Sequence, residues 1–452
     1  MDMKVLYYMW LGARLYAGSE SPKILLTRYN CNIEKIYNAS YEDYLAAGVI
    51  KQDAKLLCDK NLEMAKKYYN YCIEQRVGIL CYDSPMYPQR LKLISNPPGM
   101  FYFLGRLEML DDHPCIAMVG TRSCSENGFR TAYRIGYEAA YYGIVPINGI
   151  AAGIDAAVLM GALDADGYVV AVLGNGIDRI YPSQNKELFR KISRRGLILS
   201  EFPPFSKPDG KNFPVRNRVM SGLSLGTLVL EADLGSGAVH TANHAFIQGR
   251  KIYAVPGDIN NPLYSAPLEL IKKGAKAVTC ASDIVEEYRG MFPHRINTDI
   301  SKIKIPASME KSAIQSVFGT VNEGKNEQIT LPKPKRIAKN KSGYEGKKPY
   351  DKNHEKNAQE TVFDEEIPKQ KQDMLHNGMK MSECRIFSQL SVEEQKVLCM
   401  FDSREFITVD DVVAAGYKVD DAMASLTLLE IYSCISSKPG GKYFINPLLL
   451  QK

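Results

Sequence analysis

Residues 115–149 have the sequence CIAMVGTRSCSENGFRTAYRIGYEAAYYGIVPING. An apolar run ends at Gly120, a segment with apolar residues at helical spacing follows, and a second apolar run ends at Gly149. Parallel strands need a crossover of a dozen or more residues between them, usually a helix. The stretch therefore predicts a strand, a helix and a second, parallel strand.

The same alternation extends on both sides of this stretch. Further apolar runs, each bounded by turn residues, occur at residues 77–82, 168–174, 196–202, 226–232, 251–257 and 275–280. Amphipathic segments separate several of these runs. Strands that alternate with helices indicate βαβ units, so we expect an α/β fold with a mostly parallel sheet over residues 76–290.

The regions on either side of this core have a different character. Residues 1–75 carry apolar residues at helical spacing, which predicts a small helical domain. Residues 291–385 are rich in Lys, Glu, Asn and Gln with few aromatic residues, which is typical of a disordered basic linker. Residues 386–452 contain three helical patterns and a hairpin turn at Pro439-Gly440-Gly441, so we expect a winged-helix domain.

Composition narrows the class of protein. The 452 residues are enough for two or three domains, and a net charge of +6 permits a nucleic-acid partner without requiring one. The ten cysteines are dispersed and form no C-x-x-C pair, which suits the reducing cytoplasm. No apolar stretch approaches the roughly 20 residues that cross a bilayer, so we expect a cytoplasmic protein without a membrane segment. A P-loop, a dinucleotide fingerprint and metal-ligand spacings are absent, so we expect no cofactor and no metal.

Glycine-bearing turns follow several of the predicted strands. In one of them, Gly120 precedes Thr121, Arg122 and Ser123 at the start of a predicted helix. Free backbone N–H groups at a helix start favour an anion, and a guanidinium forks onto phosphate. Any one such turn is also compatible with a plain solvated loop. Four similar turns occur at residues 148–157, 172–182, 234–242 and 255–259. Loops at the carboxyl ends of parallel strands gather at one edge, so the five turns together predict a phosphate or nucleotide surface.

Residues 212–222, NFPVRNRVMSG, place an aromatic ring, a proline and two arginines within a few positions. We interpret this stretch as a basic turn before a helix, forming one wall of a nucleic-acid groove with Phe213 as a stacking face. Arg216 and Arg218 are two positions apart, and residues at that spacing do not share a face of a helix. We therefore expect one arginine to contact phosphate and the other to brace a neighbouring strand or loop.

Residues 77–288 resemble the DNA-processing protein A (DprA/Smf) family in the order and density of their motifs. The matching stretches include AMVGTRSCSENG, NGIAAGIDAA, VAVLGNGIDRIYP, FPVRNRVMSGLS, LVLEADLGSGA and GRKIYAVPG. The resemblance implies a Rossmann-like core with a SAM-like helical N-terminal domain and a C-terminal winged helix. It also implies a non-enzymatic protein that binds single-stranded DNA without sequence preference, protects DNA in natural transformation and loads the RecA recombinase. Such a protein is expected to form a homodimer through its Rossmann-like domain.

Carried over by motif, the resemblance implies a set of nucleic-acid-binding residues: Thr121, Arg122, Ser123, Gly149, Lys211, Phe213, Arg216, Asn217, Arg218, Ser236 and Gly237. The chain departs from the family pattern at Asn148, Ala152 and Leu159. It departs again after the Ser-Gly pair, where Ala238, Val239 and His240 precede Thr241 in place of the usual Leu-Ile.

Two other functions fit parts of the sequence. Phosphoribohydrolases of the lysine-decarboxylase-like type have a similar core, with a catalytic glutamate at a strand end that is comparable with Glu231, but the Pro-Gly-Gly-x-Gly-Thr run of those enzymes is missing. A scaffold whose winged helix binds a protein or a duplex is the third possibility. The segment KVDDAMASLTLLEIYSC is acidic and apolar, which favours a protein contact over duplex recognition there.

Overall fold

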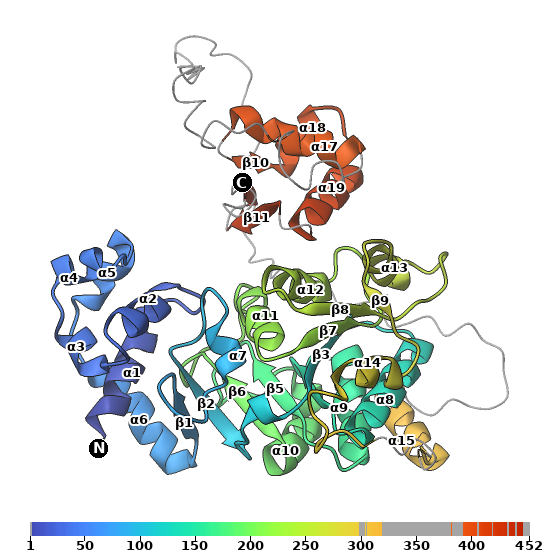
Figure 1. The fold of residues 1–452 in the computed structure, drawn as a ribbon, viewed down its shortest axis with the longest axis horizontal. Coiled ribbons are helices and arrows are strands. Elements are labelled where there is room, and N and C mark those ends of the chain that lie inside the picture. Colours follow the sequence, from blue (N-terminus) through green and yellow to red (C-terminus); the bar gives the residue numbers. More distant parts are fainter. Residues whose placement is uncertain are drawn as a thin grey trace, which may run out of the picture.

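The computed structural model describes residues 2–297, 303, 305–318, 381, 392–404, 406–417, 419–431, 434–438 and 441–445 (Figure 1). Its centre is a nine-stranded sheet with the strand order β1-β2-β6-β5-β4-β3-β7-β8-β9. The strands are β1 (Gly78–Cys81), β2 (Met100–Gly105), β3 (Cys115–Val119), β4 (Val145–Asn148), β5 (Val170–Leu173), β6 (Leu197–Ser200), β7 (Gly226–Val229), β8 (Lys251–Ala254) and β9 (Lys276–Ala277). Neighbours from β6 to β9 pair in parallel, and β2 and β1 extend the β6 edge in antiparallel fashion. The predicted α/β fold with a mostly parallel sheet is confirmed.

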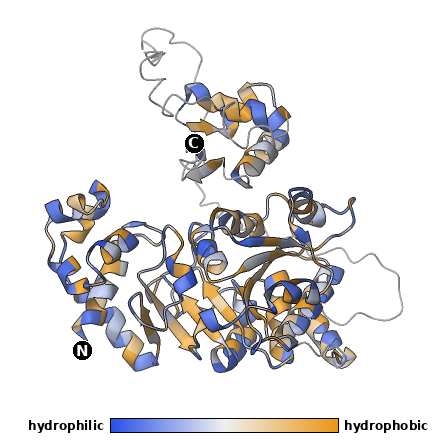
Figure 2. Cartoon of the chain, in the orientation of Figure 1, coloured by the Kyte–Doolittle hydropathy of each residue, from blue (hydrophilic) through white to orange (hydrophobic). Residues whose placement is uncertain are grey.

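Helices cover the sheet and explain why its central strands, β3 to β7, are mostly apolar. Every residue of β3 to β7 is buried, and Figure 2 shows hydrophobic colouring along the central strands. A parallel sheet covered on both faces has continuous apolar strands rather than alternating ones, which is the pattern that the sequence displays. The helices of this region are α7 (Gln89–Lys92), α8 (Glu126–Tyr141), α9 (Ile154–Asp164), α10 (Lys186–Arg195), α11 (Asn212–Gly222), α12 (Gly237–Ile247), α13 (Ser265–Lys272) and α14 (Ser282–Tyr288).

The order of the strands reverses at β3. The chain proceeds from β3 outward through β4, β5 and β6, and then crosses back through α11 to place β7 on the other side of β3. Ala117 of β3 consequently pairs with Ile147 of β4 on one side and with Thr227 of β7 on the other. In open α/β sheets the carboxyl ends of the strands at such a reversal form a crevice in which ligands bind.

Two glycines bring α8 and α9 into backbone contact. A Cβ added at Gly136 of α8 would lie 2.2 Å from the carbonyl oxygen of Val158, and one added at Gly161 of α9 would lie 2.0 Å from that of Tyr133. No side chain larger than hydrogen fits at either position. The two helices are therefore locked at a fixed separation.

The N-terminal region is helical, as the sequence predicts. Its helices are α1 (Met3–Arg14), α2 (Ser21–Arg28), α3 (Ile33–Asn38), α4 (Tyr41–Ala46), α5 (Lys51–Leu57) and α6 (Glu63–Gln75). Leu6 and Trp10 of α1 belong to the same buried apolar cluster as Phe101 of β2. The helical region therefore packs directly on the antiparallel edge of the sheet.

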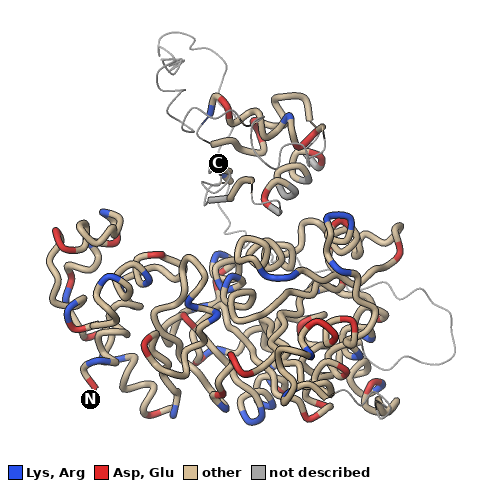
Figure 3. The backbone as a smooth tube through the Cα atoms, in the orientation of Figure 1, with Lys and Arg blue, Asp and Glu red and all other residues tan. Residues whose placement is uncertain are grey.

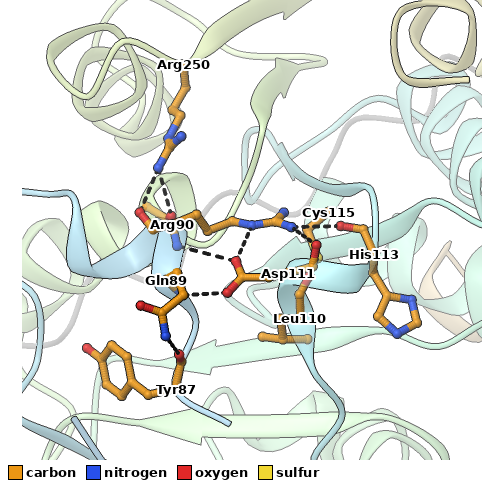
Figure 4. Close-up of polar contacts among 9 residues, drawn as sticks. Tyr87, Gln89, Arg90, Leu110, Asp111, His113, Cys115 and Arg250 are labelled. Atoms are coloured by element: carbon orange, nitrogen blue, oxygen red, sulfur yellow. Dashed lines mark hydrogen bonds and ion pairs between the residues drawn. The ribbon is translucent and has the colours of Figure 1, made fainter. Parts of the chain in front are cut away.

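A buried arginine joins that edge to the parallel part of the sheet (Figure 4). The Nε of Arg90 donates to the carboxylate of Asp111 at 2.8 Å, and its Nη2 donates to the carbonyls of Asp111 and His113 at 2.8 and 3.1 Å. The carbonyl of Arg90 itself accepts from Arg250, directly before β8, at 2.8 Å. The segment before β3 and the segment before β8 thus share one polar junction.

One part of the expected linker is a helix. Residues Ala307–Phe318 form α15, which packs on α8. The ring of Phe318 meets Phe129 edge-on at 5.6 Å between centroids, and Glu310 pairs with Arg130 at 3.3 Å. The expectation of a disordered linker from residue 291 is therefore wrong for this segment, because its apolar face finds a partner on α8. Residues 319–380 lie outside the described part of the chain.

The C-terminal region contains the elements expected of a winged helix. They are α17 (Val392–Cys399), β10 (Phe406–Thr408), α18 (Val409–Ala414), α19 (Val419–Ile431), β11 (Ile435–Lys438) and β12 (Lys442–Ile445). The three strands form an antiparallel sheet in the order β10-β12-β11. Gly441 has a φ of +71° in the hairpin turn predicted there, while the two residues before it are outside the described ranges.

The surface gives little direct indication of where a ligand binds. Lys and Arg are interspersed with Asp and Glu over the molecule (Figure 3). A binding site must therefore be located from local geometry.

Among the residues that the structure describes, no helix has the length and apolar character to span a bilayer.

We predict that Gly136→Ala destabilises the protein by about 1–3 kcal/mol, because the added methyl group forces α8 away from α9. The matched control is Gly12→Ala in α1, where an added Cβ meets no atom within 4 Å. Replacing an exposed helical glycine with alanine should stabilise by up to about 1 kcal/mol. Thermal unfolding followed by circular dichroism measures both changes, and equal melting temperatures for the two variants would contradict the close contact.

Candidate nucleic-acid interface

A pocket of about 640 Å³ lies at the point where the strand order reverses. Its walls are the turns after β3, β4 and β7 together with α11 and the start of α12. Nine of the eleven expected binding residues line this pocket or an adjoining one of about 200 Å³: Thr121, Arg122, Ser123, Gly149, Phe213, Arg216, Asn217, Ser236 and Gly237. The turns that the sequence places after separate strands do converge.

Arg122 is the exposed cation of the pocket. It follows Gly120 in the turn between β3 and α8, and its guanidinium carbon lies 5.1 Å from the centre of the Phe213 ring. In the described part of the chain Arg122 forms no ion pair with a carboxylate. A guanidinium held over an aromatic face and not engaged by a carboxylate is available to a phosphate.

Arg216 forms the floor of the pocket. Its side chain is buried, and its guanidinium donates to the carbonyl of Gly149 at 3.2 Å and to that of Val172. A Cβ at Gly149 would lie 2.3 Å from this guanidinium, so only glycine fits there. Burial lowers the pKa of Arg216 to about 10, and the nearby Asp155 opposes that shift. Arg216 therefore remains a cation at neutral pH.

Asp155 shapes the turn beneath the pocket. Its carboxylate accepts from the backbone N–H groups of Gly149 at 3.0 Å and Ala151 at 3.4 Å. Burial raises the pKa of Asp155, and Arg216 partly offsets that rise. The carboxylate thus orders the turn after β4 and provides a counter-charge to Arg216.

Two aromatic rings stand side by side at the mouth of the pocket. Tyr181 stacks on Phe213 with 5.7 Å between ring centroids and an angle of 28° between planes. Tyr181 is 40% exposed, whereas Phe213 is held between Tyr181, Arg122 and the backbone of Gly174. Our expectation assigned stacking to Phe213, but the more accessible ring belongs to Tyr181, which the sequence analysis did not single out.

Arg218 does not reach the pocket. It is 3% exposed, and its Nη2 donates to both carboxylate oxygens of Glu201 at 2.7 Å. The two arginines of α11 thus point in different directions, as their spacing predicts. Arg218 braces the end of β6 through Glu201, and Arg216 braces β5 and the turn after β4 through the carbonyls of Val172 and Gly149, so bracing is not confined to one of them. The expected contact of Arg218 with DNA is not compatible with its position. Lys211 is exposed just before α11 and does not line the pocket.

The stretch NFPVRNRVMSG is itself the helix α11, not a turn before one. Pro214 occupies its first turn, where the backbone N–H groups have no helical acceptor and a proline costs nothing. Arg216 to Gly222 are buried, so most of this basic-looking segment is interior. The interpretation as an exposed basic turn is wrong, because distant carbonyl and carboxylate groups accept from its arginines.

Glu231 has a structural position. It is 1% exposed, does not line the pocket, and accepts from the backbone N–H and the hydroxyl of Ser125 at 2.8 and 2.5 Å. Its carboxylate lies against Gly128, where a Cβ would be 2.1 Å away. A glutamate held in this way supports the start of α8 and is buried outside the pocket, which weighs against the phosphoribohydrolase alternative.

Comparison with known proteins identifies the family to which the chain belongs. The family model described as DNA recombination-mediator protein A matches residues 78–289. Protein Smf of Synechocystis is 34% identical over 270 residues, covering 58% of this chain and 68% of that protein. DNA processing protein DprA of Bacillus subtilis is 34% identical over 245 residues, covering 54% and 81%. The X-ray structure of DNA processing protein A from Streptococcus pneumoniae aligns with a TM-score of 0.55 at 28% identity, covering 64% of this chain and 98% of that one. The chain is therefore a member of the DNA recombination-mediator protein A family, the DprA/Smf proteins.

Proposed function

We propose that the protein binds single-stranded DNA without sequence preference in the pocket at the β3–β7 reversal. The observation that carries the proposal is the exposed Arg122 guanidinium, held over Phe213 at the mouth of a pocket with Arg216 beneath. Sequence-tolerant binding of single strands combines cations that follow the phosphates with rings on which bases stack. Arg122 supplies the first of these and Tyr181 the second.

Family membership supports a wider role for this binding. We propose that the protein protects incoming DNA during natural transformation in the cytoplasm and delivers it to the RecA recombinase as a homodimer. We also propose that it acts as a binding protein and not as a catalyst. Light scattering of the purified chain tests the dimer, and RecA ATPase activity on single strands coated with a single-strand-binding protein tests the delivery.

We expect a strong preference for single strands, because only unpaired bases can stack on an exposed ring. We also expect a steep dependence on salt, because phosphate contacts release counterions from the DNA. Fluorescence anisotropy with labelled oligo-dT and with a duplex of equal length, each at two salt concentrations, measures both properties. Equal weak binding of the two DNAs would leave only non-specific charge attraction and would overturn the proposal.

Arg122→Ala is expected to weaken binding of oligo-dT and to flatten its salt dependence by about 0.7 in the log–log slope, the loss of one phosphate contact. Arg195→Ala is the matched control. Arg195 lies at the end of α10 just before β6, where the parallel strands begin and not where they end, and it pairs there with Asp166. Identical titrations for the two variants would remove Arg122 from the site.

Tyr181→Ala is expected to cost about 1–3 kcal/mol of binding free energy, the range for one stacked base. Phe246→Ala is its control, since Phe246 is also exposed but lies near the end of α12 and outside the pocket. A Tyr181 variant that binds as tightly as the Phe246 variant would show that no base stacks there.

A further inference from the structure

We propose that Phe205 is a positioning residue for the candidate site. Its ring docks the loop between β6 and α11, residues 201–211, on the N-terminal helix α6, and its backbone fixes the turn that carries Tyr181. This inference rests on the proposed function and adds to it a link between the N-terminal helical region and the bound strand. Phe205 lines neither the pocket nor the adjoining one, so we assign it no contact with DNA.

The backbone of Phe205 is strained. Its φ of +74° lies in the left-handed region, where a bulky side chain is unusual. A residue keeps such a conformation only when its surroundings fix it, and such residues gather at functional sites. The contacts that hold Phe205 therefore indicate what its conformation is for.

Helix α6 holds the ring. Tyr71 meets it edge-on, with 5.0 Å between ring centroids and 70° between planes, and Tyr68 lies at 6.4 Å. The Nζ of Lys67 lies 5.1 Å from the centre of the same ring. Edge-to-face aromatic pairs and a cation near a ring face are both favourable contacts. The loop is thus attached to a helix of the N-terminal region.

The backbone of the loop is bonded to the turn after β5, residues 174–181. The N–H of Phe205 donates to Oδ1 of Asp178 at 2.7 Å, and the carbonyl of Ser206 accepts from the N–H of Gly176 at 3.0 Å. A Cβ at Gly176 would lie 2.8 Å from the carbonyl oxygen of Pro203. Loop and turn are therefore in direct backbone contact.

The turn itself is closed by hydrogen bonds. The side-chain amide of Asn175, which is buried, donates to the carbonyls of Gly176 at 2.9 Å and Arg179 at 2.8 Å. Tyr181 follows two residues after Arg179 and lines the pocket. The bonds from the loop therefore reach the exposed ring through a short segment that is bonded to itself.

The loop also reaches from this anchor to the pocket. Pro208 and Gly210 line the pocket, three and five residues after Phe205. Three residues span at most about 11 Å, so the anchor lies near the pocket wall. Without the contact on α6, the loop and the turn bonded to it lose the support that holds Tyr181 at the mouth of the pocket.

The test is fluorescence anisotropy of the full-length protein with labelled oligo-dT. We expect Phe205→Ala to bind roughly tenfold more weakly than the wild type, within the range for residues that influence a site without contacting its ligand. Its salt dependence should stay unchanged, because no phosphate contact is lost. Phe205→Tyr should retain the affinity, because it retains the ring.

Two variants separate the ring from the backbone conformation. Phe205→Gly adopts the left-handed φ readily but has no ring, so it should bind as weakly as Phe205→Ala. Tyr71→Ala removes the partner of the ring on α6, outside the pocket, and should cause a similar loss. Ile73→Ala is the matched control, because Ile73 is exposed on the same helix and does not line the hollow around Phe205.

A double-mutant cycle with Tyr181 distinguishes positioning from direct contact. If Phe205 acts by holding Tyr181, the loss caused by Phe205→Ala should shrink from roughly tenfold to about twofold or less in the Tyr181→Ala background. Two residues that contact the strand independently would instead lose affinity additively. Circular dichroism verifies that every variant is folded.

Specific outcomes would overturn the inference. Wild-type affinity in Phe205→Ala or in Tyr71→Ala would exclude the anchor on α6, and wild-type affinity in Phe205→Gly would reduce the role of Phe205 to its backbone. An equal loss in both backgrounds of the cycle would exclude an action through Tyr181. A wild-type protein that binds no oligo-dT would instead overturn the proposed function, and the inference with it.

Discussion

A buried carboxylate organises the edge of the sheet that carries the candidate site. Glu231 lies two residues after the end of β7, and its carboxylate accepts from Ser125 at the start of α8. Its backbone carbonyl accepts from the N–H of Thr121 at 2.6 Å. These bonds tie the turn after β3 to the strand beyond the reversal. The carboxylate fills the space that a side chain at Gly128 would need. Its bonds to Ser125, together with the bond from Thr121 to its carbonyl, hold the turn that carries Arg122 in one position.

Much of the fold is predictable from the sequence, because a doubly covered parallel sheet produces apolar runs of strand length separated by helical patterns. The convergence of the glycine turns is predictable for the same reason, since the carboxyl ends of parallel strands meet at one edge. The structure of α15 is not, because its apolar face is stabilised by contact with α8 and α9, which are far away in the chain.

The roles of individual side chains are less accessible to sequence reasoning. Arg216 and Arg218 look equivalent in NFPVRNRVMSG, and what separates them is the position of Gly149 and Glu201, which no local pattern reveals. The sequence pattern does not single out Tyr181, because this residue lies eight positions after the end of β5. It stacks on Phe213 only in the folded chain. In both cases the deciding partner is remote in sequence.

The backbone contact between α8 and α9 has a consequence for the energetics of binding. The two helices begin at the turns that carry Arg122 and Gly149, and the N–H of Ile154 donates to the carbonyl of Thr121 at 3.2 Å, so the turns are bonded to each other as well. The turns after β3 and β4 are in this sense preorganised, because they are held in place before a ligand arrives. In the proposed binding of single-stranded DNA, the conformational entropy lost on association would fall mainly on the nucleic acid, and an already extended strand would lose least.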